Sequence, residues 1–270
     1  MPGLIAWRCW LVCLWLVMMG GAGQAAGSCR QALVLALDVS SSVDTVEYGL
    51  QIKGLAATLL DPEVQALLLS EPANPIALTI FEWSGRFDQR SVIGWTIIQS
   101  PADLLAISGV LMQHERPEMS RPTAIGPALA HAGRLLQTGP DCRKRTIDIS
   151  GDGKHNDGDR PVLGRTAAIF ATTTVNALVI GHDAPPGLRS IDGEIADLSA
   201  YFRAEVIHGP GAFIETAFGF QDFQAAMKRK LLRELAMVLA IGPNEIAGPM
   251  ANGPDPNAPR WGKTTAARQP

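Results

Sequence analysis

The chain has 270 residues and a mass of 28.8 kDa, and its formal net charge is −3, from 23 basic and 26 acidic side chains. Hydrophobic residues make up 47% and charged residues 18%, which excludes a disordered chain and a coiled coil. The near-neutral balance gives no support for a nucleic-acid-binding surface, which needs clustered Lys and Arg, so we expect no nucleic-acid partner.

The first 27 residues have the pattern of a secretory signal peptide. One basic side chain, Arg8, precedes an unbroken apolar run over 9–19, and small residues follow over 20–27. A transmembrane helix needs about 20 apolar residues, so we expect no transmembrane span in the mature chain. An uncleaved N-terminal anchor is the competing interpretation, and a lipoprotein is disfavoured because Ser28 immediately precedes Cys29. The expected localisation is exported, either periplasmic or secreted.

Short apolar runs alternate with segments of helical periodicity along the rest of the chain. In chain order, the pattern of the first half predicts a strand over 33–37, a helix over 46–59, strands over 76–83 and 92–98, and helices over 101–113 and 123–136. The second half predicts a strand over 145–150, a helix over 161–172, a strand over 175–180, a helix over 192–204, a strand over 212–216 and a helix over 221–239. This alternation predicts an α/β domain over 28–240, a doubly wound and mostly parallel sheet with helices on both faces. Residues 241–270 are rich in Pro, Gly, Asn and Ala and are expected to form a flexible C-terminal tail.

Four basic residues of the last predicted helix are interpreted as its solvated face. They are Lys228, Arg229, Lys230 and Arg233. Four cysteines are present, and Cys9 and Cys13 lie in the predicted leader. The remaining two are a candidate disulfide in an exported protein, and two unrelated thiols are the alternative.

Polar side chains follow the ends of two predicted strands. The first strand runs into Asp38-Val-Ser40-Ser-Ser42, and the strand over 145–150 runs into Gly-Asp152-Gly. In doubly wound sheets, ligands bind just beyond the carboxyl ends of the strands. For the first segment, the structural alternative is that Ser42 or Asp44 caps the next helix.

A third polar position, Thr123, opens a predicted helix after the loop over 114–122. Taken alone, Thr123 is best interpreted as the N-cap residue of that helix. Taken with the two strand-end motifs, it completes a set of five oxygen-bearing side chains.

Together these segments resemble the von Willebrand factor A-type (vWA) domain and its metal-ion-dependent adhesion site, over about 30–240. The residues that match the family's motif positions are Asp38, Ser40, Ser42, Thr123 and Asp152. The usual Thr-Asp-Gly of the family is Gly-Asp-Gly here, which keeps the aspartate. More narrowly, the FEWS segment at 81–84 and the SGDG segment at 150–153 resemble a bacterial exported family of unassigned function.

The resemblance implies a divalent cation as cofactor. Hydroxyl and carboxylate oxygens are hard donors that suit Mg²⁺, with Ca²⁺ and Mn²⁺ as alternatives, and no His/Cys set indicates zinc. The resemblance implies Ser40, Ser42 and Thr123 as metal ligands, with the aspartates acting partly through water. Ser41 and Asp148 are candidates for outer positions that support the ligands.

The resemblance therefore implies an exported, metal-dependent protein-binding module of the adhesion or scaffold type. Its partner would be another protein, which offers an acidic side chain to the cation. We expect no enzyme, because no nucleophile–base pair accompanies the site. Two alternatives stay open: a metal-dependent hydrolase in which Asp38 and Asp152 hold a metal that activates water, and a vWA-like fold with a purely structural cation.

Residues 148–159 also resemble a calcium loop of the EF-hand kind. An EF-hand loop follows a helix, whereas 145–149 is a predicted strand, so this reading is disfavoured. Asp148 lies inside that strand and needs a partner, because an unpaired buried carboxylate is costly. Arg145 and a supporting role at the metal are the two alternatives.

The resemblance also places the strands over 33–37 and 145–150 side by side. Cys29 precedes one and Cys142 precedes the other. A Cys29–Cys142 disulfide is therefore implied, at the edge of the sheet opposite the metal site.

Overall fold

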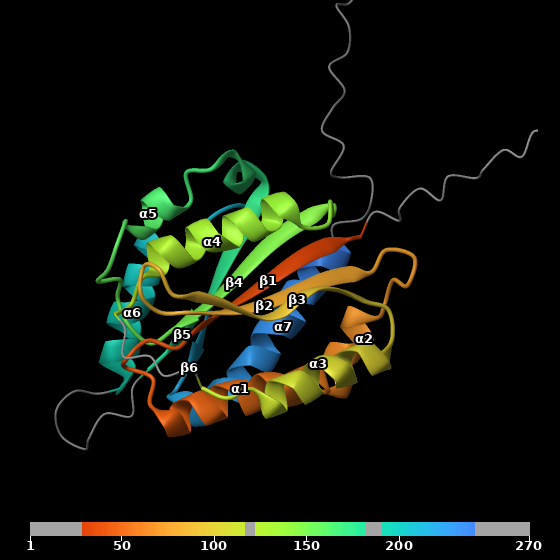
Figure 1. The fold of residues 1–270 in the computed structure, drawn as a ribbon, viewed down its shortest axis with the longest axis horizontal. Helices are drawn as coiled ribbons and strands as arrows, with labels where there is room; N and C mark the ends of the chain where they lie inside the picture. Colours follow the sequence, from red (N-terminus) through yellow and green to blue (C-terminus); the bar gives the residue numbers. More distant parts are fainter. Residues whose placement is uncertain (1–28, 117–121, 182–190, 241–270) are drawn as a thin grey trace, which may run out of the picture.

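A computed structural model describes residues 29–116, 122–181 and 191–240 of the chain. The predicted leader and tail, 1–27 and 241–270, lie outside the described residues. At the centre is a six-stranded sheet in the order β3-β2-β1-β4-β5-β6 (Figure 1). Its strands are β1 Gln31–Asp38, β2 Ile76–Trp83, β3 Gln89–Ile98, β4 Lys144–Gly151, β5 Thr173–Ile180 and β6 Ile214–Ala217. The edge strand β3 runs antiparallel to β2, and all other neighbouring strands are parallel.

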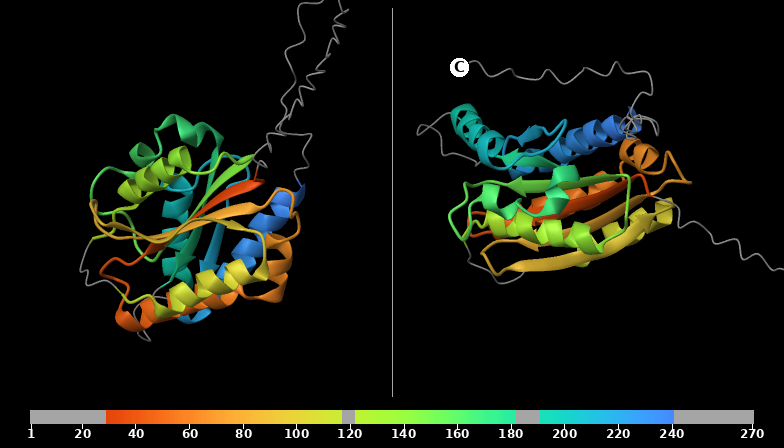
Figure 2. Two further views of the ribbon diagram at one scale, coloured as in Figure 1. Left: turned by 45° about the vertical axis from the view of Figure 1, so that its right-hand side comes forward. Right: turned by 90° about the horizontal axis from the view of Figure 1, so that it is seen from above.

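Helices cover both faces of this sheet (Figures 1 and 2). One face carries α1 Thr45–Leu59, α2 Pro62–Leu68, α3 Pro101–Gln113 and α7 Phe223–Ala240, together with the 3-10 turn η2 Phe220–Asp222. The other face carries α4 Ile125–Thr138, α5 Pro161–Gly164 and α6 Ile191–Glu205, together with the 3-10 turn η1 Ala168–Thr172. The predicted doubly wound α/β fold is confirmed.

The central strand β1 shows why the sheet is buried on both faces. Every residue from Gln31 to Asp38 is buried. Its leucines at 33, 35 and 37 pack into the core under α1 and α7, and Ala32, Val34 and Ala36 pack into the core under α4. A strand that is apolar on both sides, instead of alternating apolar with polar, is typical of parallel sheets covered by helices.

The structure differs from the predicted elements around Pro62 and Pro161. The Asp61-Pro62 pair ends α1 and also begins α2, because Asp61 accepts a hydrogen bond from the backbone N–H of Glu63 and Pro62 takes the first helical position. The single helix predicted over 161–172 is two short turns, α5 and η1. The turn α5 ends at Gly164, where an added Cβ would lie 2.1 Å from the Gly126 carbonyl oxygen, so the backbones of α4 and α5 are in direct contact.

The strand order reverses direction between β1 and β4. These two strands pair in parallel, from Gln31 opposite Lys144 to Ala36 opposite Ile149. The two connections that leave them therefore run to opposite sides of the sheet. None of the described helices is both long and apolar enough to cross a membrane.

A disulfide joins Cys29 and Cys142 at the start of this strand pair, as predicted. Both cysteines are buried. The backbone continues the β1–β4 ladder next to them, because Arg143 N donates to the Cys29 carbonyl at 3.0 Å and Lys144 N donates to the Arg30 carbonyl at 3.0 Å. The disulfide thus closes the end of the sheet opposite the Asp38 end.

A charged cluster lies buried between α7 and the centre of the sheet, and it corrects two predictions. Lys230 is fully buried and forms ion pairs with Asp148 and, at 3.8 Å, with Glu234. The interpretation of Lys230 as part of a solvated helix face is therefore wrong. Asp148 faces Lys230 instead of supporting the metal ligands, and Arg145 pairs with Asp141 at 2.6 Å. The helix faces of α7 could not be assigned from its basic residues alone.

Neutral polar side chains complete the cluster around Glu234. Gln31 Nε2 donates to Glu234 Oε1 at 2.5 Å, and Asn176 Nδ2 donates to Glu234 Oε2 at 3.3 Å. Burial raises the pKa of Glu234 to about 8, and the negative charge of Asp148 adds to the shift while Lys230 opposes it. With one carboxyl protonated, the cluster of two acids and one ammonium is electrically neutral.

This shift predicts the pH dependence of stability. Because the pKa of Glu234 in the folded state lies above the ordinary value of 4.5, its contribution is complete below about pH 4.5 and is lost as the pH rises to about 8. We expect the free energy of unfolding, measured with urea in the presence of a chelator, to fall over this window. Glu234→Gln keeps a neutral side chain at every pH and should flatten the slope. Equal slopes for the two proteins would contradict this assignment.

Candidate metal centre

The predicted site residues from β1 and β4 meet where the strand order reverses. Asp38 is the last residue of β1, and Asp152 directly follows Gly151, the last residue of β4. The crevice beyond the carboxyl ends of the strands at such a reversal is the usual ligand site of doubly wound sheets. Both side chains are buried, with Asp38 at 0% and Asp152 at 1% exposure.

The loop from β1 to α1 brings the two predicted serines to this crevice. Ser40 N donates to Asp38 Oδ1 at 2.8 Å, which turns the loop back over the end of β1. Asp44, and not Ser42, is the N-cap of α1, and it accepts a hydrogen bond from Glu47 N at 2.8 Å. The Ser42 hydroxyl instead donates to Asp152 Oδ1 at 2.8 Å and lies 3.2 Å from Ser40 Oγ.

Thr123 reaches the same place from the loop before α4. Its Oγ1 lies 3.4 Å from Ser40 Oγ. The N-cap position of α4 is Ala124, which makes no side-chain cap bond, so the interpretation of Thr123 as a capping residue is wrong. Three chain segments thus bring the five predicted residues into one hydrogen-bonded cluster.

Two residues that the sequence analysis missed hold these segments in place. Gln51 is fully buried in α1; its Nε2 donates to the Asp38 carbonyl at 2.9 Å, and its Oε1 accepts from Ser150 Oγ at 3.3 Å. Asn156 bonds Thr123 in both directions, with Oδ1 accepting from Thr123 N at 2.8 Å and Asn156 N donating to the Thr123 carbonyl at 2.9 Å. Gln51 could have been found from the sequence, because it is a polar residue on the apolar face of the predicted helix over 46–59. No comparable sequence pattern marks Asn156.

Residue 151 is glycine, where the vWA domains that this chain resembles usually have threonine, and the structure gives a physical reason. A Cβ added at Gly151 would lie 3.2 Å from the ring of Phe202 in α6 and 3.3 Å from Asp38 Oδ2. Both distances are tighter than ordinary van der Waals contacts, so a side chain there would press on the buried carboxylate. Ser41, the other candidate for a supporting role, is exposed, and its role stays a prediction.

Two buried carboxyl groups lie next to each other in this site, which favours a bound cation. Burial raises the pKa of Asp38 well above its usual range, and the adjacent charge of Asp152 raises it further, against hydrogen bonds from Ser40 and from the backbone of Asp152. Asp38 Oδ2 is buried and receives no well-formed hydrogen bond from the described residues. A divalent cation would offset both carboxylate charges and engage this oxygen.

The donor set therefore fits a hard divalent cation. Two carboxylates and three hydroxyls supply only oxygen atoms, which is the donor type that Mg²⁺ and Ca²⁺ prefer. Among the residues that the structure describes, no group of three or more His, Cys, Asp or Glu side chains could hold a metal ion. The EF-hand reading of 148–159 is excluded, because the strand β4 leads into that segment and includes its first four residues, where an EF-hand loop would follow a helix.

Substitution of Asp38 by asparagine tests this assignment. In the presence of a chelator, we expect Asp38→Asn to retain or raise the free energy of unfolding, because a neutral amide removes the repulsion with Asp152. Mg²⁺ at about 100 times its Kd should stabilise the wild type by roughly 2.7 kcal/mol and leave Asp38→Asn unchanged. Thermal unfolding with and without Mg²⁺ measures both effects. Asp157→Asn, on the same loop as Asp152 but paired with Arg86, is the control that keeps the response.

A family model described as "Protein of unknown function (DUF1194)" matches residues 28–239. The chain belongs to the DUF1194 family. No curated protein matches this DUF1194 sequence significantly.

Solved structures share the fold of the DUF1194 chain. Proximal thread matrix protein 1 from the mussel byssus, in a structure "with zinc occupied MIDAS motif", is 17% identical with a TM-score of 0.52, over 77% of this chain and 48% of that one. The pilus adhesin SpaC from Lactobacillus rhamnosus GG is 12% identical with a TM-score of 0.52, over 78% of this chain and 30% of the adhesin. The DUF1194 chain thus spans less than half the length of either protein. The predicted vWA-like fold, in a bacterial family of unknown function, is confirmed.

Proposed function

We propose that this DUF1194 protein is an exported binding module that holds Mg²⁺ and captures an acidic side chain of a partner protein through it. The observation that carries this proposal is the convergence of the five site residues. They come from the segments after β1, before α4 and after β4, and hydrogen bonds such as Ser42 Oγ to Asp152 Oδ1 at 2.8 Å join them.

The chemistry of the residues favours binding of a carboxylate. Asp38 and Asp152 offset the charge of the cation, and the hydroxyls of Ser40, Ser42 and Thr123 are neutral donors. The cation, when bound, supplies Lewis-acid attraction for an anionic oxygen. Asp38 and Ser40 are buried, whereas Ser42 is exposed. The protein therefore encloses the Asp38 side of the site and leaves the Ser42 side accessible to a partner.

Further support comes from the protein's relatives in structure and from its disulfide. One structural neighbour is a pilus adhesin, and the other is described with a zinc-occupied MIDAS motif, the metal-ion-dependent adhesion site. Disulfides form and persist in oxidising compartments, so the Cys29–Cys142 disulfide favours an exported protein, as does the leader pattern.

The proposal is tested by metal and partner binding in one pair of variants. Titration calorimetry should show Mg²⁺ binding to the wild type, weakened at least about tenfold in Ser40→Ala. In affinity capture from envelope extract, a partner should be retained in Mg²⁺ and released by chelator, and Ser40→Ala should not retain it. Ser91→Ala, an exposed serine of β3, is the matched control that behaves as wild type. Partners unchanged by chelator and by Ser40→Ala would refute the metal-bridged model.

A further inference from the structure

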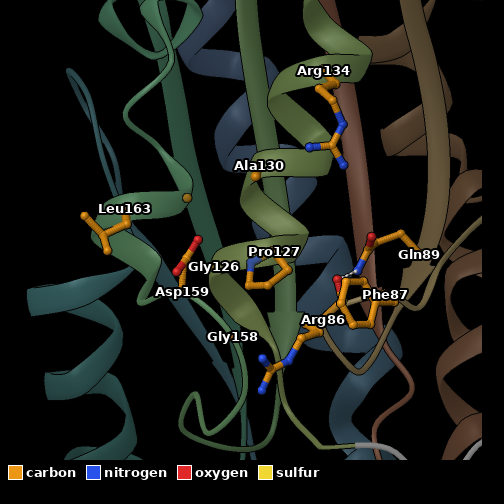
Figure 3. Close-up of a pocket in the computed structure, with 11 residues that line it drawn as sticks. Arg86, Phe87, Gln89, Gly126, Pro127, Ala130, Arg134, Gly158, Asp159 and Leu163 are labelled. Carbon is orange, nitrogen blue, oxygen red and sulfur yellow. Dashed lines mark hydrogen bonds between the residues drawn. The ribbon is translucent and has the colours of Figure 1, made fainter.

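A groove runs along α4, the helix that begins two residues after Thr123 (Figure 3). Its volume is about 320 Å³, and its lining comes from α4, α5, the β2–β3 turn and the loop after β4. In Figure 3, Pro127 and Ala130 of α4 lie between Leu163 on one side and Phe87 on the other, and Arg134 lies further along the helix. The groove begins at Gly126, three residues after Thr123.

The groove exposes large apolar side chains to solvent on both sides. Phe87 is 90% exposed and Leu163 is 54% exposed. Exposed side chains of this size gain free energy when a partner covers them, at roughly 25 cal/mol per Å² of apolar surface. They flank small residues, so an extended segment of another chain can lie between them.

Direct contacts join the segments that line the groove. At its base, a Cβ added at Gly126 would lie 1.9 Å from the Asp159 carbonyl oxygen, so the backbone of α4 and that of the next loop are in direct contact. On the Phe87 side, Arg86 is held by Asp157, which accepts from both the Arg86 backbone N–H and its Nε at 2.8 Å. A preformed groove binds with a smaller loss of conformational entropy.

The groove has an arginine at each end, and among the described residues only the one near the start of α4 is paired with a carboxylate. Arg86 pairs with Asp157, and Asp159 lies near it. Arg134 is exposed and forms no ion pair within the described part of the chain. The end of the groove far from the metal therefore presents an uncompensated positive charge, complementary to an acidic side chain.

The positions of Arg134 and the metal ligands set a length for the occupant. Arg134 lies nine residues after Ile125, the first residue of α4, which is about 14 Å at the helical rise of about 1.5 Å per residue; with the two steps from Thr123 to Ile125, Thr123 and Arg134 lie roughly 16 Å apart. An extended peptide covers that distance in about five residues, at roughly 3.3 Å each.

We propose that this groove is the second half of the partner-binding surface. Its occupant is an extended segment of the partner protein with two acidic side chains about five residues apart and an apolar side chain between them. One carboxylate binds the cation, the apolar side chain packs between Phe87 and Leu163, and the other carboxylate pairs with Arg134. This inference rests on the proposed function and specifies its partner.

Selection of random peptides displayed on phage tests the inference. The immobilised full-length protein is loaded with Mg²⁺, and bound phage are eluted with chelator. We expect the eluted peptides to share an acidic pair at the stated spacing around an apolar residue. Synthetic copies should bind Arg134→Glu about 5- to 10-fold more weakly and Phe87→Ser about tenfold more weakly, by fluorescence anisotropy.

Matched controls use the same substitutions elsewhere on the surface. Lys53→Glu, on α1 across the sheet, makes the same change of charge, and Phe218→Ser removes another exposed phenylalanine. Both should bind as wild type. Chelator-eluted peptides that bind Arg134→Glu and Phe87→Ser as tightly as wild type would overturn the groove and leave the proposed function standing. A selection that yields no chelator-eluted peptide would overturn both.

Discussion

Loss of the Cys29–Cys142 disulfide is expected to lower the free energy of unfolding by about 4–5 kcal/mol. The disulfide joins positions 113 residues apart, so it closes a long loop in the unfolded chain. In the chain-entropy model, a closed loop of this length removes more unfolded conformations than a short one. An effect of this size is a large part of the stability of a typical domain, which is about 5–15 kcal/mol.

Urea unfolding of the wild type and of the Cys29→Ser/Cys142→Ser variant measures this loss. The midpoint of the variant should be lower, and the slope should be steeper because a chain without the cross-link exposes more surface. A reductant should lower the midpoint of the wild type toward that of the variant and leave the variant unchanged. A wild-type midpoint insensitive to reductant would contradict the prediction.

Replacement of Lys230 by methionine is expected to cost about 3–5 kcal/mol of unfolding free energy. Lys230 and Asp148 are both buried, and the ammonium is the cation paired with that carboxylate. Lys230 also lies 5.6 Å from the centre of the Phe213 ring, a cation–π contact that methionine would lose. The substitution leaves Asp148 and Glu234 as two buried acids without a counter-charge.

Two further variants separate the charge effect from a packing effect. Lys230→Met/Asp148→Leu removes both charges and should recover much of the lost stability, because apolar pairs often replace buried ion pairs without loss. Lys228→Met is the matched control, since Lys228 lies two residues away on α7 and pairs with Asp61 at the surface. In urea unfolding, Lys228→Met should lower the free energy of unfolding far less than Lys230→Met. A double variant no more stable than Lys230→Met would show that the charge is not the cause.

The disulfide and the candidate metal centre are linked by the register of β1 and β4. The two cysteines are 113 residues apart, and the same offset relates paired residues of the strands, such as Gln31 and Lys144. A shift of the strands by one residue would turn the side chains of one strand to the opposite face. The disulfide at one end therefore helps to hold Asp38 opposite Gly151, next to Asp152, at the other end.

Most of the strands and helices could be predicted from local sequence, and the resemblance to the vWA domain selected the five candidate ligands. Apolar runs such as 33–37 and 76–83 are long enough to indicate buried strands, and the D-x-S-x-S segment at 38–42 follows one of them directly. The strand predictions were confirmed because the sequence signal and the structure involve the same few residues, and the role of the five residues as metal ligands stays a prediction. The predicted helix over 161–172 was wrong because the backbone contact between Gly164 and Gly126, far apart in sequence, decides where α5 ends.

The sequence by itself determined the alternation of strands and helices, the motif residues and their order, because hydrophobic periodicity and turn chemistry act over short distances along the chain. Only the tertiary structure decided which polar side chains are partners. Lys230 is predicted at the surface from sequence, but in the fold α7 lies on β4 and Lys230 pairs with the buried Asp148. Gln51 is a polar residue on an apolar helix face, and its partner, the Asp38 carbonyl, is known only from the fold. The groove beside α4 likewise needs Phe87, Leu163 and Arg134 brought together. A buried or exposed charge is a property of what packs over it, and that is set by contacts far apart in sequence.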